Sequence, residues 1–249
     1  MISIAFLSPL RLLALVGSAV LIASGAARAD TRVVGSGKQQ SETRAVSPFQ
    51  AVTLKGSINL VLRQAAKEAV EVRADDNLLP LIETRVVDHS SGPTLEIRVK
   101  NGSSYSSRQP VVVTVDVVRL KSLTLAGSGE AVAEALKTSD LEVQIAGSGN
   151  LQLRQLSADN LAVTVAGSGD VSATGRSGKL SVTIAGSGGV QTRELEAQDV
   201  SVEIAGSGDA HVHARKTLAV SIAGSGDVDY TGDATTAVSV VGTGSVKKR

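Results

Sequence analysis

The stretch LEVQIAGSGNLQL, residues 141–153, decides the fold of this 249-residue chain. In it, apolar Leu141, Val143 and Ile145 alternate with polar residues, and the alternation resumes at Leu151 and Leu153 beyond the Ala-Gly-Ser-Gly. A period of two is typical of a strand with one buried face. The pattern therefore predicts a β-strand on each side of a glycine-containing corner, with the apolar side chains on the inside.

The corner tetrapeptide recurs along the C-terminal half of the chain. Six copies of Ala-Gly-Ser-Gly begin at residues 126, 146, 166, 185, 205 and 223, and a Val-Gly-Thr-Gly begins at residue 241. A unit of about 20 residues cannot bury a core alone, so the copies must stack on one another. We therefore expect an all-β fold, a right-handed parallel β-helix whose rungs, or single turns of chain, lie about 4.8 Å apart. Equivalent residues should form inner ladders, such as Ile145, Val165, Ile184, Ile204 and Ile222.

Each corner carries two glycines and one serine at equivalent positions. Continuing the alternation through Gly147 and Gly149 puts both on the inner side, where we expect no room for a side chain. We expect the serines to serve the structure, with their hydroxyls bonded to the neighbouring backbone; a binding role for the row is the alternative. The row is Ser128, Ser148, Ser168, Ser187, Ser207, Ser225 and Thr243.

The first 29 residues have the features of a secretory signal peptide. Arg11 precedes a short apolar run at residues 12–23, and Ala27-Arg28-Ala29 supplies small residues for cleavage before Asp30. An uncleaved N-terminal anchor is the alternative interpretation. No later apolar run has membrane-spanning length. We therefore expect an exported protein, periplasmic or at the cell surface, with no integral membrane segment after cleavage.

Residues 30–125 lack the clear repeat but keep strand-like alternation, as at Ile58, Leu60 and Leu62. We interpret them as an irregular N-terminal β portion that leads into the regular β-helix of residues 126–249. Residues 78–84 suit a single helical turn. A separate N-terminal domain is the alternative.

Composition excludes several classes of function. Two of the 25 basic residues lie in the signal, which leaves 23 against 24 acidic residues, so no charge imbalance favours nucleic acid or anionic lipid. Phe49, Tyr105 and Tyr230 are the only aromatic residues beyond the signal. Sugar sites and single-stranded nucleic-acid sites usually stack on aromatic rings. Cysteine is absent, so no disulfide framework or thiol nucleophile exists.

The chain from residue 30 onward resembles a family of secreted bacterial proteins described as "putative auto-transporter adhesin, head GIN domain". The resemblance implies a β-helical, two-part domain of the cell envelope or surface, and it supplies no catalytic or binding residues. It is carried by residues 33–37 (VVGSG), 49–61 with Lys-Gly-Ser-Ile, 74–82 with Asp-Asn-Leu-Leu-Pro-Leu-Ile, 120–129, and the later Gly-Ser-Gly-Asp-Val copies.

One segment could hold a metal ion. Asp209, His211 and His213 alternate with small apolar residues, and Asp227 and Asp229 fall at equivalent positions one rung later. Two imidazoles beside carboxylates on one strand face suit zinc or a similar ion. An ordinary solvated strand face is the alternative. No other cofactor is expected.

A second row of polar residues follows the corners, and its carboxylates suggest calcium as a weaker hypothesis. Asn150 and Gly189 interrupt the row, and an acidic residue there also favours a turn. The row is Glu130, Asn150, Asp170, Gly189, Asp209 and Asp227.

No catalytic constellation stands out, so we predict a protein that is not an enzyme. Lys247, Lys248 and Arg249 should act as a polar cap that discourages end-to-end stacking. The predicted function is adhesion or scaffolding through an envelope or surface partner, glycan or protein. A carbohydrate-active β-helix, binding or cleaving polysaccharide with paired carboxylates, is the alternative.

Overall fold

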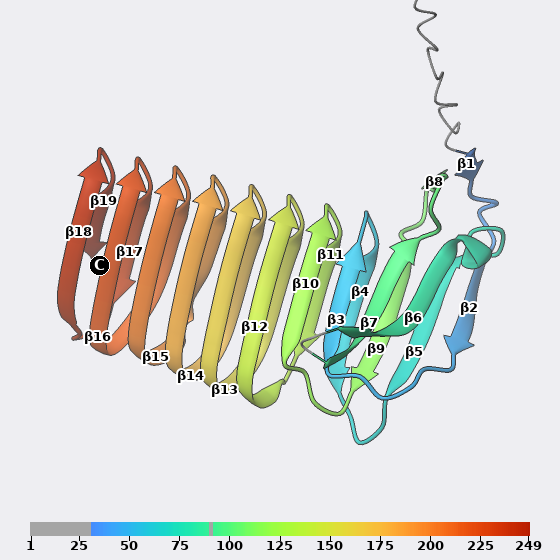
Figure 1. Cartoon of the computed structure of the whole chain (residues 1–249), viewed down its shortest axis with the longest axis horizontal. Helices are drawn as coiled ribbons and strands as arrows, with labels where there is room; N and C mark the ends of the chain where they lie inside the picture. The colour runs from blue at the N-terminus through green and yellow to red at the C-terminus, as the bar shows by residue number, and fades with distance from the viewer. Residues whose placement is uncertain (1–30, 90–91) are drawn as a thin grey trace, which may run out of the picture.

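Stacked turns of chain form the C-terminal half of the computed structural model, which describes residues 31–89 and 92–249 (Figure 1). The predicted signal peptide lies outside the described residues. Every strand in this half pairs in parallel with the strand one rung away. These strands are β10 (Ser122–Gly127), β11 (Glu130–Glu134), β12 (Lys137–Gly147), β13 (Asn150–Gly167), β14 (Asp170–Gly186), β15 (Gly189–Gly206), β16 (Asp209–Gly224), β17 (Asp227–Thr231), β18 (Thr235–Gly242) and β19 (Ser245–Lys248).

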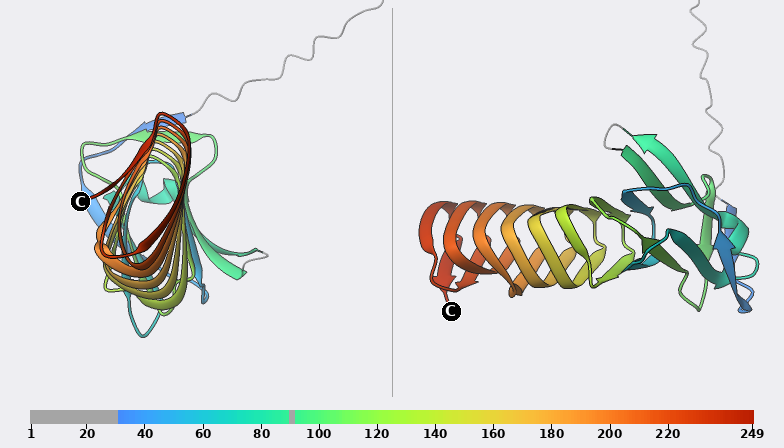
Figure 2. Two further views of the ribbon diagram at one scale, coloured as in Figure 1. Left: turned by 90° about the vertical axis from the view of Figure 1, so that its left-hand side faces the viewer. Right: turned by 90° about the horizontal axis from the view of Figure 1, so that it is seen from below.

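Each rung is flattened into two sides, which stack into two parallel sheets (Figure 2). The front sheet contains β10, β12, β18 and the C-terminal parts of β13 to β16, and the back sheet contains the other strands of the solenoid. In the view of Figure 1 the front strands run upward, the chain returns downward behind them, and successive rungs advance to the left. The solenoid is therefore right-handed, as predicted.

The inner ladder predicted from the sequence is confirmed. Ile145 pairs with Val165, and the same register continues through Ile184 and Ile204 to Ile222, each at most 1% exposed. Burying an aliphatic side chain of this size contributes about 1.5–3 kcal/mol. Identical chemistry in successive rungs therefore keeps the stack in register, because a one-residue slip would turn the whole apolar face outward.

The two corner glycines are required for different reasons. Gly147 has a φ of +132°, and a Cβ there would lie 2.4 Å from the carbonyl oxygen of Gly127 in the preceding rung. Gly169, the second glycine of its corner, is buried, and a Cβ would lie 2.3 Å from the Gly149 oxygen and 2.8 Å from Cγ2 of Ile145. The expectation that no side chain fits at either position is confirmed.

The N-terminal part is a mixed sheet that grows out of the solenoid. The pair β3 and β4 forms a rung beneath β10 and β11, with parallel pairing to both, and Gly56 lies beneath Gly127 at its corner. The elements here are β1 (Thr31–Val34), β2 (Gln39–Arg44), β3 (Ala51–Lys55), β4 (Asn59–Gln64), β5 (Ala69–Asp75), the 3-10 turn η1 (Leu79–Leu81), β6 (Ile82–His89), β7 (Gly92–Val99), β8 (Ser103–Ser106) and β9 (Val112–Val117).

Beyond this rung the pairing changes direction. The strand β9 pairs in parallel with β4 but antiparallel with β5, and β5 pairs antiparallel with β2. The hairpin of β6 and β7 projects from the side of the solenoid (Figure 2). One cluster of buried apolar residues runs from Phe49 in this part to Val228 in the solenoid. No helix in the described part of the chain has the length and hydropathy that a membrane span requires.

Candidate functional site

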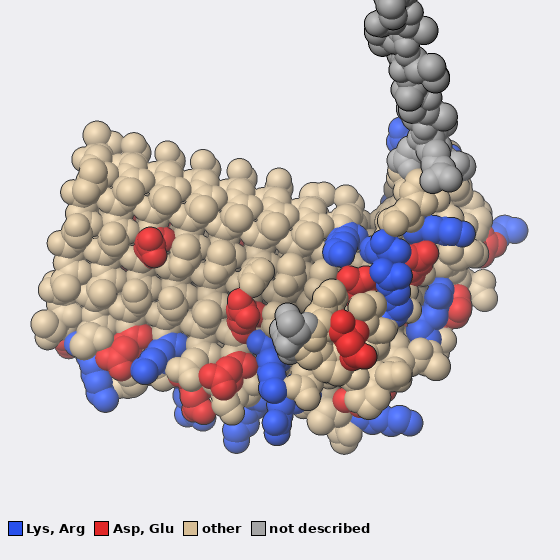
Figure 3. All heavy atoms as spheres, viewed as in Figure 1, with Lys and Arg blue, Asp and Glu red and all other residues tan. Residues whose placement is uncertain are grey.

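The outer surface of the front sheet, which we call the front face, is flat because its outward side chains are small. Between β10 and β16 every outward residue of three columns is Ser, Thr or Ala, apart from Glu142, Gln144 and Glu203. Figure 3 shows this face largely free of charge, with charged residues gathered along its lower edge and over the N-terminal part. The columns are Ser122, Glu142, Ala162, Ser181, Ser201, Ala219, Ala237; Thr124, Gln144, Thr164, Thr183, Glu203, Ser221, Ser239; and Ala126, Ala146, Ala166, Ala185, Ala205, Ala223, Val241.

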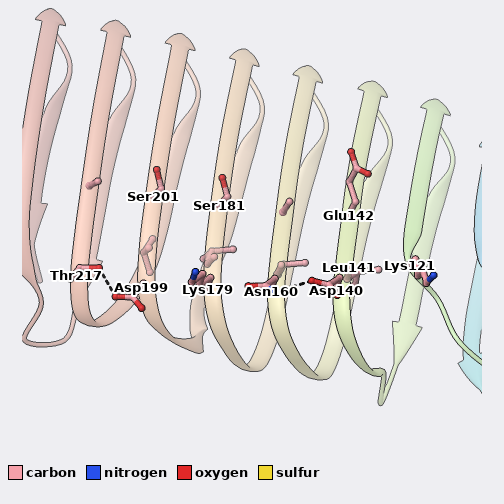
Figure 4. A pocket seen from close by; sticks show the side chains of 15 residues that line it. Lys121, Asp140, Leu141, Glu142, Asn160, Lys179, Ser181, Asp199, Ser201 and Thr217 are labelled. Atoms are coloured by element: carbon pink, nitrogen blue, oxygen red, sulfur yellow. Dashed lines mark hydrogen bonds between the residues drawn. The ribbon is translucent and has the colours of Figure 1, made fainter. Parts of the chain in front are cut away.

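A shallow hollow of about 640 Å³ runs along the lower edge of this face (Figure 4). Its lower rim is a row of polar side chains, one from each rung. The order cation, anion, neutral side chain occurs two times along the row. Nδ2 of Asn160 donates to Oδ1 of Asp140 at 2.8 Å, and Oγ1 of Thr217 donates to Oδ1 of Asp199 at 2.6 Å. The row is Lys121, Asp140, Asn160, Lys179, Asp199 and Thr217.

The hollow combines two kinds of contact that a binding surface needs. Its floor is the front sheet, whose outward side chains here are small, with Glu142 as the charged exception: Glu142, Ala162, Ser181, Ser201 and Ala219. Its rim offers hydrogen-bond donors and acceptors and charges of both signs, with one side chain about every 4.8 Å along the axis. Such an arrangement suits an extended partner that lies across several rungs and takes hydrogen bonds at one margin.

The acidic row after the corners has a structural task. Each Asp or Asn oxygen accepts a hydrogen bond from the backbone amide one rung later: Oδ1 of Asn150 from Asp170 at 3.2 Å, and Oδ1 of Asp170 from Gly189 at 2.8 Å. Oδ1 of Asp209 accepts from the amide of Asp227 at 3.0 Å. The row ties rungs together where the strand pairing is interrupted, which explains its residue types without calcium.

The serine row at the corners differs from the prediction. Backbone amides make the expected bonds instead of hydroxyls: Ser148 N donates to the Gly127 oxygen at 2.9 Å, and Ser168 N to the Gly147 oxygen at 2.9 Å. The serine hydroxyls are exposed, and two hydroxyl pairs bond to each other, Ser57 with Ser128 and Thr243 with Ser225. The amide already satisfies the carbonyl below, so the hydroxyl has no backbone partner to seek.

The five candidate metal ligands lie near one another but do not converge. Nδ1 of His211 is 3.5 Å from Oδ2 of Asp229, and that oxygen also accepts from Nε of Arg249 at 3.0 Å. The Asp209 carboxylate accepts a hydrogen bond from the backbone amide of Asp227. His213 is aligned with Thr231 of the next rung, which is not one of the candidate ligands. The described residues contain no group of three His, Cys, Asp or Glu side chains placed to hold a metal. The metal hypothesis gains no geometric support and stays a prediction.

Asp227 instead bonds to the rung that follows it. Its Oδ1 accepts from the amide and the hydroxyl of Ser245, at 2.9 and 2.6 Å. The hydroxyl bond is the main reason that the pKa of Asp227 lies below its ordinary value of 3.8. This carboxylate is therefore occupied by hydrogen bonds within the protein, as those of Asp170 and Asp209 are.

A charged cluster surrounds Glu96 on β7. The carboxylate is 8% exposed and lies within 2.9 Å of Arg85, 3.4 Å of Lys55 and 3.6 Å of His89. The hydrogen bonds from Arg85 hold the pKa of Glu96 below its ordinary value of 4.5. Sequence reasoning missed this cluster, because its members come from β3, β6 and β7 and meet only through long-range pairing.

A second polar cluster fixes the N-terminal segment. Oγ of Ser36 donates to Oδ1 of Asp76 at 2.5 Å, and this bond is the main cause of a lowered Asp76 pKa. Asn77 accepts the amide of Ser36 and donates to the Val34 carbonyl. The Asp-Asn turn after β5 thus anchors the residues that follow β1, which is a structural role.

Comparison with known proteins identifies relatives of this arrangement. Residues 48–234 match the family described as "putative auto-transporter adhesin, head GIN domain". No curated protein matches the chain significantly.

Among solved structures, three similar bacterial proteins share the fold over almost the whole described chain. A "putative adhesin" of Bacteroides fragilis has a TM-score of 0.79 and 24% identity, covering 87% of this chain and 100% of that one. A "putative lipid binding protein" of Parabacteroides distasonis has a TM-score of 0.72 and 28% identity, and the match covers 88% of this chain and 100% of that one. A "putative adhesin" of Parabacteroides merdae has a TM-score of 0.70 and 22% identity, and the match covers 88% of this chain and 99% of that one.

Proposed function

Because the chain belongs to the head GIN domain family of auto-transporter adhesin-like proteins, we propose that it is an exported, non-enzymatic binding module of the bacterial envelope. In this proposal the solenoid is a rigid support that holds the front face toward a partner at the envelope or cell surface. The localisation follows from the predicted signal peptide and from the family description.

The flatness of the front face is the observation that carries the proposal. Its strands span about 30 Å along the axis, and the three columns span about 13 Å across it, an area of about 400 Å². Solvent-exposed strands usually carry many charged residues, yet only Glu142 and Glu203 are charged here. A rigid face of small side chains loses little side-chain entropy on binding, which supports a role in contact with a flat or extended partner.

The arrangement of carboxylates favours binding over catalysis. Glu142 and Glu203 stand three rungs apart, about 14 Å, which exceeds the separation that glycosidases use. Asp140 and Glu142 lie about 7 Å apart on β12, but both are exposed. A catalytic acid is usually kept protonated by burial. On the front face, the carbohydrate-active alternative would depend on this exposed pair.

Attachment of living cells tests the proposal. A deletion strain would be complemented with the wild-type gene, with Ser181→Arg/Ser201→Arg on the front face, or with Gln152→Arg/Gln191→Arg on the back sheet as a control of equal charge. We expect the front-face variant to attach no better than the deletion strain and the control to restore attachment. Equal attachment by both variants would refute a role for the front face.

Purified protein then identifies the class of partner. Binding would be measured to isolated envelopes, a cell-wall glycan panel, and phosphatidylethanolamine–phosphatidylglycerol vesicles, because a relative of this fold is described as lipid binding. Release of oligosaccharides that disappears in Asp140→Asn/Glu142→Gln would establish the enzyme alternative instead.

A further inference from the structure

The strand β18 has the side-chain pattern of an inner strand but lies at the end of the stack (Figure 1). Its Val238 and Val240 align with Val220 and Ile222 of β16, which are 4% and 1% exposed, yet they are 50% and 39% exposed themselves. With Val241 they make three of the five exposed large hydrophobic residues in the described part of the chain. The apolar end of the core is therefore open at β18.

The basic residues near this end do not protect it. Nζ of Lys248 lies 3.0 Å from Oδ1 of Asp233, and Nε of Arg249 lies 3.0 Å from Oδ2 of Asp229. These residues lie on or beside β19, on the back of the last rung, whereas β18 itself carries no charged residue. The polar cap predicted from the sequence therefore leaves the front edge uncovered. Soluble proteins rarely leave a long, uncharged, apolar edge strand without a partner.

The edges of the large sheet at the opposite end of the molecule make a poor match for β18. At the opposite end of the molecule, β2 presents Glu42 and Arg44, and β6 presents Glu83, Arg85 and Asp88. Head-to-tail stacking would place these charges against the valines of β18, at a cost in desolvation. β18 has the uncharged sequence Thr-Thr-Ala-Val-Ser-Val-Val. The strand that matches it in charge and hydrophobicity is β18 of a second copy of the chain.

We propose that two copies of the chain associate through β18, paired antiparallel about a two-fold axis. Residues directly opposite in an antiparallel pair point to the same face, so Val238 lies opposite Val240 of the second copy and Ser239 lies opposite its own equivalent. The valines of both copies then close the two open cores against each other. The interface is isologous and closed, so no filament forms.

The dimer changes the size of the binding surface. A two-fold axis perpendicular to the front sheet leaves both front faces on the same side, where they join into one surface of about 800 Å². That area matches one side of a standard protein interface, which a single face does not reach. The inference rests on β18 alone and stands whatever the front face binds.

Sedimentation equilibrium of the purified full chain tests the dimer. We expect the wild type to have the mass of two chains. Ser239→Lys/Val241→Lys sets like charges across the axis without touching the core and should raise the dissociation constant about a hundredfold. Ser221→Lys, at the aligned outward position one rung inside, is the matched control and should stay dimeric.

Cross-linking gives an independent measurement, because the chain has no cysteine of its own. Under mild oxidation, Ser239→Cys should form a disulfide between two copies, and Ser221→Cys should not. A wild type that sediments as one chain at its solubility limit, a larger assembly, or a dimer unaffected by Ser239→Lys/Val241→Lys would overturn the proposal.

Discussion

Replacing Gly186 with alanine should destabilise the whole solenoid, although it adds a single methyl group. The φ of Gly186 is +135°, where a side chain costs about 1–2 kcal/mol. The added Cβ would lie 2.4 Å from the carbonyl oxygen of Gly167, 3.1 Å from its carbon and 3.2 Å from its nitrogen. All three are backbone atoms, and Gly167 is itself stacked on Gly147, so no flexible group can move aside.

Relief requires the corner to widen between two rungs. That movement would stretch the bonds that Ser187 N and Gly188 N donate to the Gly167 oxygen, now 2.9 and 3.1 Å long. Overpacking of this kind costs about 1–3 kcal/mol. Together with the backbone strain, we expect a loss of about 2–5 kcal/mol in the free energy of unfolding, a large share of the stability of an ordinary domain.

Urea unfolding followed by far-UV circular dichroism measures this loss, because the chain has no tryptophan for fluorescence. Ser187→Ala is the matched control: the residue is adjacent and exposed, and its substitution should change the free energy by less than about 0.5 kcal/mol. If Gly186→Ala unfolded within that same margin of the wild type, the close approach of successive backbones at the corners would be wrong.

Three further predictions address the polar groups. Asp170→Ala removes the acceptor of the Gly189 amide and should cost about 1 kcal/mol in urea unfolding; Asp159→Ala, which replaces an exposed aspartate on β13, should cost nothing measurable. Because the folded-state pKa of Glu96 lies below 4.5, the unfolded chain binds its proton at higher pH than the folded chain does. The stability from this contact is therefore complete above pH 4.5 and is lost as the pH falls through the lower folded value, so the urea midpoint should fall less steeply with acid in Glu96→Gln. Zinc titration by calorimetry of the wild type and of His211→Ala/His213→Ala tests the metal hypothesis: it predicts a heat that disappears with the histidines, and the same heats for both proteins would end it.

The regular half of the fold could be predicted because its information is local. The alternation around Ile145 determines which side is buried, and the spacing of the glycines determines which residues align. The hydroxyl bonds of the serine row were predicted wrongly, because the choice between amide and hydroxyl depends on corner dihedrals that the sequence pattern does not specify. The backbone at Gly147 turns to positive φ, and this places the Ser148 amide over the carbonyl below.

The candidate site was harder to predict than the fold. In the sequence, the rim residues Asp140, Lys179 and Asp199 look like ordinary turn residues in front of an alternating apolar run, although each of them lies within a strand of the structure. Only the registers across β13, β14 and β15, which shift between Leu153 and Leu156 and between Ser172 and Gly175, bring them into one row. The antiparallel pairing of β2, β5 and β9 is likewise a choice among distant partners, which no periodicity encodes.

Distances between outward positions of the front sheet test most directly the stacking on which the front face depends. Spin labels on introduced cysteines at Glu142 and Ala219, four rungs apart, and at Ser122 and Ala219, five rungs apart, would be measured by pulsed electron resonance in excess unlabelled protein. Parallel rungs in register predict backbone separations of about 19 and 24 Å, which increase by one rung spacing. Equal distances, or a second pair closer than the first, would contradict the stacked arrangement and with it the flat binding face.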